Sequence, residues 1–385
     1  STGEEAVGAA RVHLGGPLDG EWHLEILNPQ IVKGARLVVN YSLDSSDSLV
    51  KLILLLDMLR MYGAANIELV LVGEPKFGNG LDEVMGYFCD AVAWRSLDRI
   101  TPVKIAALEP ITKKELPIWV DRILYQHGRL KDDAEEAALS VNAAVDRVMI
   151  YKNKENPLSW KVALPEGLSG QNIILVHSTE NNADIAELWA MLIALRRAGV
   201  ASVSLISTYS GYARQDRASR VGEGVSAVTM LKIIDLLADT HLVLNIHYGF
   251  TSGETKLRDY PYRMYNLNAF VQLAENMFDM VARSFQKGLL RDELNNHPII
   301  LIAPDEDAFG YVREAAELLK AYARSHYNID TRVSFGYMDK RRTGFNRVNI
   351  SPYILSGPGE SIKRVNGVTI PNCWAFVIDD EVSLG

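Results

Sequence analysis

The chain has 385 residues, of which 48% are hydrophobic and 23% are charged, so it can bury two or three cores and should be a soluble globular protein. Its formal net charge of -8 at pH 7 argues against general binding to nucleic acids or anionic membranes, and any polyanion site must be a local group of cations. It has no run of 18 uninterrupted apolar residues and no basic start followed by an apolar stretch, which favours a cytoplasmic protein without a membrane span.

The predicted elements begin with a repeat. A strand pattern at 34–42 is followed by an apolar helix period at 49–63, and the same pair recurs at 170–178 and 185–199. Among residues 34–65, identical residues stand 136 positions apart in eight pairs: Gly34/Gly170, Ser42/Ser178, Leu52/Leu188, Leu56/Leu192, Leu59/Leu195, Arg60/Arg196, Gly63/Gly199 and Ala65/Ala201. We interpret this as a duplicated strand–helix–strand unit, although unrelated units of this type also share apolar patterns.

Charged residues distinguish the two halves of the repeat. At the same spacing, Gly78 corresponds to Arg214 and Gly80 to Asp216, so the first copy keeps a scaffold and lacks the charged loop of the second. Between the copies, residues 127–136 are polar and charged, which is typical of an exposed hinge or surface helix. A domain boundary is therefore expected near residue 140.

Beyond this boundary, strands and helices alternate. The predicted strands are 171–177, 201–207, 241–247, 298–303, 331–338 and 373–379, and the predicted helices are 184–199, 225–238, 265–289 and 308–325, with a long loop after 338. This alternation predicts an α/β fold with mostly parallel sheets and helices on both faces. Ligands on such sheets bind at the carboxyl ends of strands.

A cationic loop follows the strand predicted at 201–207. It reads Tyr-Ala-Arg-Gln-Asp-Arg at 212–217 and continues through glycines into a helix near Val225. Arginine can grip phosphate oxygens with two donors, and backbone amides at a helix start favour anions, so the loop is a candidate polyphosphate site. The alternative is a solvated surface loop.

Two further strand ends carry side chains that can bind a cation. His247 ends an apolar run and can ligate a metal, contact a phosphate or form a structural hydrogen bond. Asp305 follows another apolar run, with Glu306 and Asp307 beside it. These carboxylates can attract Mg²⁺ or can stand at a helix N-terminus, which also favours negative charge.

The last two strands are followed by opposite charges. Lys340 and Arg342 come directly after the strand predicted at 331–338, at the start of the long loop, which is expected to be a lid. The run predicted at 373–379 ends in Asp379 and Asp380. Cationic and anionic groups thus follow different strands of one predicted sheet.

From about residue 160 onward, this order of motifs resembles the ribose-phosphate pyrophosphokinases, also called phosphoribosyl pyrophosphate synthetases. The resemblance implies tandem phosphoribosyltransferase-like domains. Residues 1–140 would be a degenerate copy of the synthetase N-terminal domain, 141–290 the ATP-side domain, and 291–385 the ribose-phosphate-side domain, with its C-terminal part apparently missing.

The same resemblance implies roles for particular residues. The ATP-binding residues would be Arg214, Gln215, Asp216, Arg217 and His247. In this family such a loop lines the ATP site, and ATP acts as a co-substrate with Mg²⁺.

The resemblance also implies the reacting centre. Lys340, Arg342 and Arg214 would be the catalytic cations, and His247 and Asp305 would be the metal-binding side. Positive charge at these positions would stabilise the charge that develops during phosphoryl transfer.

The ribose side is implied by the C-terminal residues. The ribose-binding residues would be Asp379, Asp380, Ser383 and Gly385. Of these, Asp379 and Asp380 match the acidic pair of the phosphoribosyl-binding signature, in which carboxylates contact ribose hydroxyls. The sequence departs from the family in the loop that would bind the 5-phosphate, where Ser383-Leu384 replaces a typical Asp-Thr pair.

The implied reaction transfers diphosphate from Mg-ATP to the anomeric hydroxyl of ribose 5-phosphate and releases AMP. The altered loop leaves open a larger acceptor such as ADP-ribose, and a catalytically silent regulatory or filament subunit is the third reading. A plain phosphoribosyltransferase is disfavoured, because the arginine loop would have no task. A homo-oligomer is expected, and the net charge argues against nucleic acid or membrane as a partner.

Overall fold

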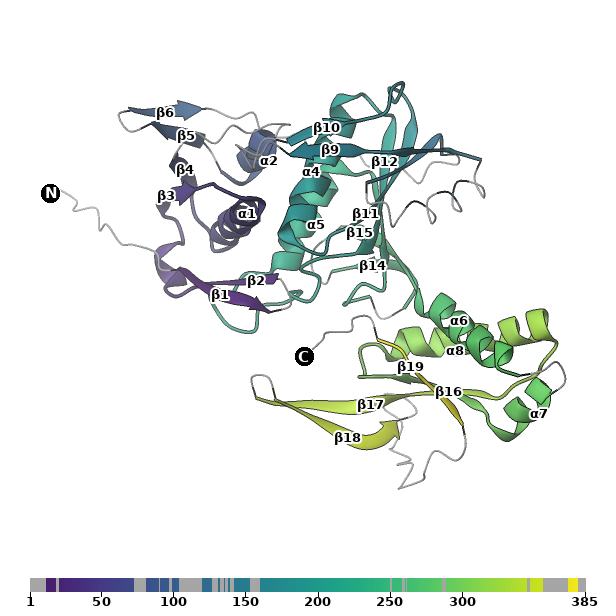
Figure 1. The fold of residues 1–385 in the computed structure, drawn as a ribbon. Helices are drawn as coiled ribbons and strands as arrows, with labels where there is room; N and C mark the ends of the chain where they lie inside the picture. The colour runs from purple at the N-terminus through teal and green to yellow at the C-terminus, as the bar shows by residue number, and fades with distance from the viewer. Residues whose placement is uncertain are drawn as a thin grey trace. The chain divides into compact units, whose positions relative to one another are not determined.

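The structure is a computed structural model in which part of the chain is described. The described residues are 12–18, 21–72, 81–89, 91–96, 99–103, 120–126, 131, 135, 138, 142–152, 160–249, 251–257, 260, 262–285, 289–344, 347–355 and 373–379. The chain divides into two compact units (Figure 1). Unit 1 contains Ser1–Leu242 and Lys256–Met264, and unit 2 contains Val243–Thr255 and Tyr265–Gly385.

The first copy, defined as the described residues of 12–103, lies in unit 1. It has a four-stranded sheet of order β3-β4-β5-β6, in which β4 runs parallel to β3 and β5, and β6 is antiparallel. Its elements are β1 (Val12–Leu18), β2 (Glu21–Ile26), β3 (Arg36–Ser42), α1 (Ser46–Met61), β4 (Asn66–Val72), α2 (Leu81–Phe88), β5 (Ala91–Ser96) and β6 (Arg99–Val103). Strands β1 and β2 form a separate antiparallel pair.

The second copy, defined as the described residues of 120–242, also lies in unit 1. Its strands belong to a sheet of order β14-β15-β13-β12-β11-β7-β8, in which β11 runs parallel to both β7 and β12. The elements of the second copy are β7 (Arg122–Tyr125), β8 (Ala144–Arg147), β11 (Asn172–Ser178), α4 (Asn182–Arg197), β12 (Ser202–Tyr209), α5 (Ser226–Leu237) and the start of β13 (Thr240–Leu244). The sheet also contains β14 (Gly253–Lys256) and β15 (Arg263–Leu267), which follow the second copy in the chain. A hairpin of β9 (Met149–Lys152) and β10 (Trp160–Ala163) accompanies them.

The structure reproduces the sequence repeat in its element bounds. The starts of β3, α1 and β4 (36, 46 and 66) and those of β11, α4 and β12 (172, 182 and 202) are 136 residues apart. The connecting turns match as well. The Gly34 N–H donates to the Gly63 carbonyl at 2.8 Å, and the Gly170 N–H donates to the Gly199 carbonyl at 2.8 Å. All four glycines have positive φ, which side chains other than glycine rarely adopt.

The two copies pack through their helices. Ser45 caps α1 in a reciprocal capping box with Ser48, and the Asn181 side chain caps α4. Helix α1 contacts α4 and α5, and Figure 1 shows these helices between the two sheets of unit 1. Because almost every apolar residue of α1 and α4 is buried, the core of unit 1 is shared by the two copies.

Unit 2 contains a four-stranded sheet of order β18-β17-β16-β19. Strand β16 lies between β17 and β19 and runs parallel to both, whereas β18 is antiparallel to β17. Residues of α6, α8 and β16, among them Phe278, Val312 and Ile299, form its core. The elements are α6 (Phe270–Arg283), α7 (Leu289–Asn296), β16 (Ile299–Ala303), α8 (Phe309–Tyr327), β17 (Val333–Gly344), β18 (Arg347–Leu355) and β19 (Trp374–Val377).

The α/β class with mostly parallel strands is confirmed, and two elements differ from the prediction. The helix expected at 265–289 is instead the end of β15, then α6 and the start of α7. The long loop expected after 338 contains the rest of β17 and all of β18, so Lys340 and Arg342 lie on a strand. No helix in the described part of the chain is long and apolar enough to span a membrane. The domain boundaries at 140 and 290 stay predictions.

Candidate functional site

The arginine loop, defined as residues 210–225, connects β12 to α5 in unit 1. Tyr212 has a left-handed φ of 63° and is 1% exposed, and its hydroxyl donates to the Asn182 Oδ1 at 2.9 Å. Arg214 and Arg217 are exposed, and the Arg217 Nε lies 3.9 Å from the Asp216 carboxylate. The loop thus has a buried tyrosine anchor and presents its arginines to solvent.

Gln215 joins the loop to two other elements. The Ser226 hydroxyl at the start of α5 donates to the Gln215 Oε1 at 2.7 Å, and the Gln215 Nε2 donates to the Trp22 carbonyl of β2 at 3.3 Å. The predicted nucleotide-binding glutamine therefore has a structural role in holding the loop against α5 and β2.

The second half of the loop pairs with β2 of the first copy. The Ile26 N–H donates to the Gly222 carbonyl at 2.6 Å, and the Gly224 N–H donates to the Leu24 carbonyl at 3.1 Å. Gly222 has a φ of 100°, and a Cβ built on it would lie 2.2 Å from the Ile26 carbonyl oxygen. Only glycine fits there, because both the backbone conformation and the approach of β2 exclude a side chain.

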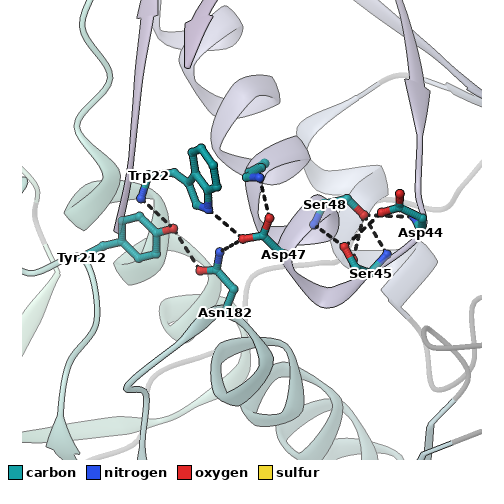
Figure 2. A network of polar contacts seen from close by, with 8 residues as sticks. Trp22, Asp44, Ser45, Asp47, Ser48, Asn182 and Tyr212 are labelled. Carbon is teal, nitrogen blue, oxygen red and sulfur yellow. Dashed lines mark hydrogen bonds and ion pairs between the residues drawn. The ribbon is translucent and has the colours of Figure 1, made fainter. Parts of the chain in front are cut away.

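A polar network lies beneath this pairing, and Figure 2 shows it reaching across both copies. The Asp47 Oδ1 of α1 accepts the indole N–H of Trp22 at 2.7 Å and the amide of Asn182 at 2.6 Å. The Lys51 Nζ pairs with Asp47 and lies 3.3 Å from the centroid of a Trp22 ring. Burial alone raises the pKa of Asp47, but hydrogen bonds from Lys51, Asn182 and Trp22 outweigh it and hold the pKa below its ordinary value.

His247 lies in unit 2, in a turn rather than at the end of a strand. Strand β13 ends at Leu244, and Asn245 then turns the chain with a φ of 43°. The fully buried Asn266 accepts the Ile246 N–H at 3.0 Å, and the Tyr311 hydroxyl donates to the Ile246 carbonyl at 2.9 Å. The partly buried His247 therefore directly follows Ile246, whose backbone N–H and carbonyl are both held by hydrogen bonds.

Asp305 lies between β16 and α8, and its Oδ1 accepts the Ala308 N–H at 3.3 Å. This contact agrees with the capping alternative. Among the described residues, no group of three or more His, Cys, Asp or Glu side chains comes together as a metal site. A carboxylate at a strand end nevertheless fits Mg²⁺, which proteins often hold through one or two carboxylates together with substrate phosphates.

The sheet of unit 2 directs three predicted site segments to one edge. Ala303 pairs with Tyr337, and Ile302 pairs with Val377. Because β16, β17 and β19 are parallel, the chain after each of them leaves from the same edge. Those segments contain Asp305, the outer part of β17 with Lys340 and Arg342, and the partly buried Asp379. Asp380, Ser383 and Gly385 lie outside the described residues.

Sequence reasoning missed the network of Trp22, Asp47, Asn182 and Tyr212. Asp47 and Asn182 each stand in the first turn of a helix, where a polar residue is ordinary, so neither carries a recognisable signal. The repeat itself was the available clue, because it places both helix starts at equivalent positions of two similar units.

Comparisons with known proteins find ribose-phosphate pyrophosphokinases among the similar proteins. A family model described as the N-terminal domain of ribose phosphate pyrophosphokinase matches residues 131–237. Ribose-phosphate pyrophosphokinase from Listeria ivanovii is 28% identical over 191 residues, covering 49% of this chain and 54% of the relative. The protein of the same name from Ureaplasma parvum is 29% identical over 234 residues, covering 60% and 62%. The chain therefore spans about half the length of the Listeria relative.

Among solved structures, phosphoribosylpyrophosphate synthetase from Mycobacterium smegmatis matches with a TM-score of 0.40 and 17% sequence identity, covering 60% of this chain and 67% of that one. Ligands of open α/β sheets bind at the carboxyl ends of the strands, which is where the charged segments of unit 2 lie. Residues 131–237 are thus similar to the N-terminal domain of ribose phosphate pyrophosphokinase, and the relatives from Listeria ivanovii and Ureaplasma parvum are similar over 49% and 60% of this chain.

Proposed function

We propose that the protein transfers the β,γ-diphosphoryl group of Mg-ATP to the anomeric hydroxyl of an acceptor that contains ribose 5-phosphate. The observation that carries this proposal is the convergence of Asp305, Asp379 and the strand bearing Lys340 and Arg342 on one sheet edge. The named relatives, which are ribose-phosphate pyrophosphokinases, support the same reaction.

In the proposed step, the 1-hydroxyl oxygen of the acceptor attacks the β-phosphorus in line. The bond from the β-phosphorus to the oxygen that bridges the α- and β-phosphates breaks, AMP leaves with that oxygen, and the hydroxyl proton passes to solvent. Arg214 would contact phosphate oxygens with its exposed guanidinium. Lys340 and Arg342 would neutralise charge on the transferred group and the leaving group, since positioning and electrostatics supply most phosphoryl-transfer catalysis.

Asp379 and Asp380 would accept hydrogen bonds from the ribose hydroxyls and so fix the direction of attack. When bound beside Asp305, Mg²⁺ would supply further positive charge for the phosphates. No covalent enzyme intermediate is required, because the acceptor oxygen is itself the nucleophile.

The acceptor is the finer part of the proposal. Ser383-Leu384 stands where the family binds a terminal 5-phosphate, so ADP-ribose, whose 5-phosphate is part of a diphosphate bridge, is the second acceptor that we propose. A silent regulatory or filament subunit is the competing assignment, and it predicts no turnover at all.

The test is to incubate the purified protein with Mg-ATP and separately with ribose 5-phosphate, ADP-ribose or unphosphorylated ribose, and to identify the products by mass. AMP should accumulate in step with one diphosphorylated acceptor, and ribose should give none. Formation of ADP, or no product with either phosphorylated acceptor, would refute the diphosphotransferase proposal.

A further inference from the structure

The first copy contacts the arginine loop of the second copy through hydrogen bonds and an ion pair. Both the backbone of β2 and side chains of the first copy take part. The contacts are Trp22 N–H to Tyr212 Oη (3.3 Å), Gln215 Nε2 to the Trp22 carbonyl (3.3 Å), Ile26 N–H to the Gly222 carbonyl (2.6 Å), Gly224 N–H to the Leu24 carbonyl (3.1 Å), Gly222 N–H to Tyr62 Oη (2.6 Å) and Arg220 to Glu25 (2.7 Å).

A second layer fixes the residues that make these contacts. Asn182 receives the Tyr212 hydroxyl on its Oδ1 and donates its own amide to Asp47 of the first copy. Asp47 also receives the Trp22 indole, so the loop anchor, helix α4, helix α1 and strand β2 share one hydrogen-bonded chain (Figure 2). Breaking one link leaves partly buried polar groups without their partner, which opposes any other arrangement.

The loop conformation requires this support. Tyr212 holds a left-handed φ of 63°, which a non-glycine residue keeps only where its surroundings impose it. Gly222 has a φ of 100° and touches the Ile26 carbonyl. Between these two positions lie Arg214 and Arg217, both exposed, so the arginines are displayed between two constrained points.

We propose that the first copy is a positioning element for the arginine loop, through Trp22, Asp47 and β2. The first copy, which has Gly78 and Gly80 at the positions equivalent to Arg214 and Asp216, thereby sets the affinity of the second copy for a polyphosphate. This inference rests on the proposed function for the identity of the ligand, Mg-ATP, whereas the restraint on the loop does not depend on it. A ligand that binds one loop conformation has an apparent affinity reduced by the fraction of molecules not in that conformation.

Tyr212→Phe tests the proposal with the smallest change. It keeps the buried ring and removes the hydroxyl that joins Asn182 to the Trp22 N–H. Hydrogen exchange at 211–225 should quicken about tenfold, and the Kd of Mg-ATP, measured by calorimetry, should rise about tenfold. If the protein turns over, KM for Mg-ATP should rise similarly while kcat changes less than about twofold, because the bound loop has the same geometry in both proteins.

The matched control is Tyr327→Phe, which removes a hydroxyl that donates to Asp279 at 2.8 Å in unit 2. It should leave the Kd of Mg-ATP and the exchange at 211–225 at their original values. A second variant, Asp47→Ala, alters no loop residue and removes the acceptor for Trp22 and Asn182. It should reproduce the effects of Tyr212→Phe. Asp44→Ala, at an exposed position just before the same helix, should not.

The outcomes separate this inference from the proposed function. Exchange at 173–176 in β11, a central strand of the same unit, is the internal reference, and an equal increase there and at 211–225 would overturn the inference by showing general destabilisation. Unchanged exchange in the loop, or faster exchange with an unchanged Kd, would also overturn it. If no acceptor yields AMP but the loop and the Kd respond as expected, the positioning role stands and the diphosphotransferase proposal fails.

Discussion

At the scale of single residues, Lys340 and Arg342 are the sharpest test of the proposed chemistry. They occupy alternate positions of β17, opposite Ile350 and Val348 of the neighbouring strand. Replacing either by Ala should lower kcat about 10²-fold or more, a loss of roughly 2.7–4 kcal/mol in transition-state stabilisation. Thermal stability should change little, because the backbone pairing of β17 with β18 remains. Steady-state kinetics with the competent acceptor and a thermal melt measure both.

The control for this pair is Lys320→Ala, an exposed lysine of α8 that pairs with Glu317 on the same helix. It should retain full activity, since such surface pairs contribute little. If Lys340→Ala and Arg342→Ala were both fully active, these two cations would have no role in catalysis. Arg214 would then be the cation to examine.

Several residue positions were predictable because strand ends are marked in the sequence. Asp305 and Asp379 follow apolar runs, and the structure places both directly after parallel neighbours. Asp47 and Asn182 were not predictable as partners. They are 135 residues apart in the sequence, and their contact depends on how helices α1 and α4 pack against each other. Residue patterns report which face of a helix is apolar and do not report which helix will cover it.

At the scale of elements, the start of α8 organises the turn that carries His247. Glu314 accepts the Asn268 amide at 3.0 Å and also the hydroxyl and N–H of Ser252. Burial alone raises the pKa of Glu314, but these hydrogen bonds outweigh it and hold the pKa below its ordinary value. Helix α8 therefore restrains the turn through a carboxylate as well as through the hydroxyl of Tyr311.

This lowered pKa predicts a pH dependence. Because the folded pKa lies below that of the unfolded chain, Glu314 contributes its full stabilisation above the unfolded pKa, and the contribution is lost as pH falls through the folded pKa. The difference in free energy of unfolding between the protein and Glu314→Gln should thus be constant near neutral pH and should shrink as the pH falls through the acid range. Urea denaturation across this range measures it. The control is Glu317→Gln on the exposed side of α8, which should change the free energy of unfolding little, because its pair with Lys320 is a surface ion pair.

Two elements show why sequence patterns are incomplete guides. In β15, Met264 and Asn266 are buried while Tyr265 and Leu267 are exposed, which is the alternation of a strand. Five residues are too few to distinguish this alternation from the period of the helix that follows, so the sequence pattern merged the two elements. In β18, polar residues and a proline obscure a strand that is defined by pairing with β17. Helix α4 was placed within two residues, because a cap and a long apolar face agree there.

At the scale of the whole molecule, a buried carboxylate holds the two copies in one unit. Asp57 of α1 is 3% exposed, accepts the Thr229 hydroxyl at 2.7 Å and pairs with Lys232, both on α5. Asp57→Ala should lower the free energy of unfolding by about 3 kcal/mol or more, because it leaves a partly buried ammonium and a buried hydroxyl without their acceptor. Urea denaturation followed by circular dichroism measures the loss.

The comparison for Asp57 is Asp146→Ala, which breaks a more exposed pair with Arg122 at 3.1 Å. That change should cost no more than about 1 kcal/mol. An equally small loss for Asp57→Ala would mean that apolar packing alone joins the helices of the two copies.

The equal spacing of β3–α1–β4 and β11–α4–β12 also limits how the gene can change. One residue inserted into α1 would rotate the rest of that helix by about 100° and turn Asp57 away from Thr229. Deleting one residue from α1 would rotate the rest of that helix by about 100° in the opposite direction. Sequence divergence between the halves is tolerated at most positions, whereas insertions and deletions within these helices would misalign both halves at once.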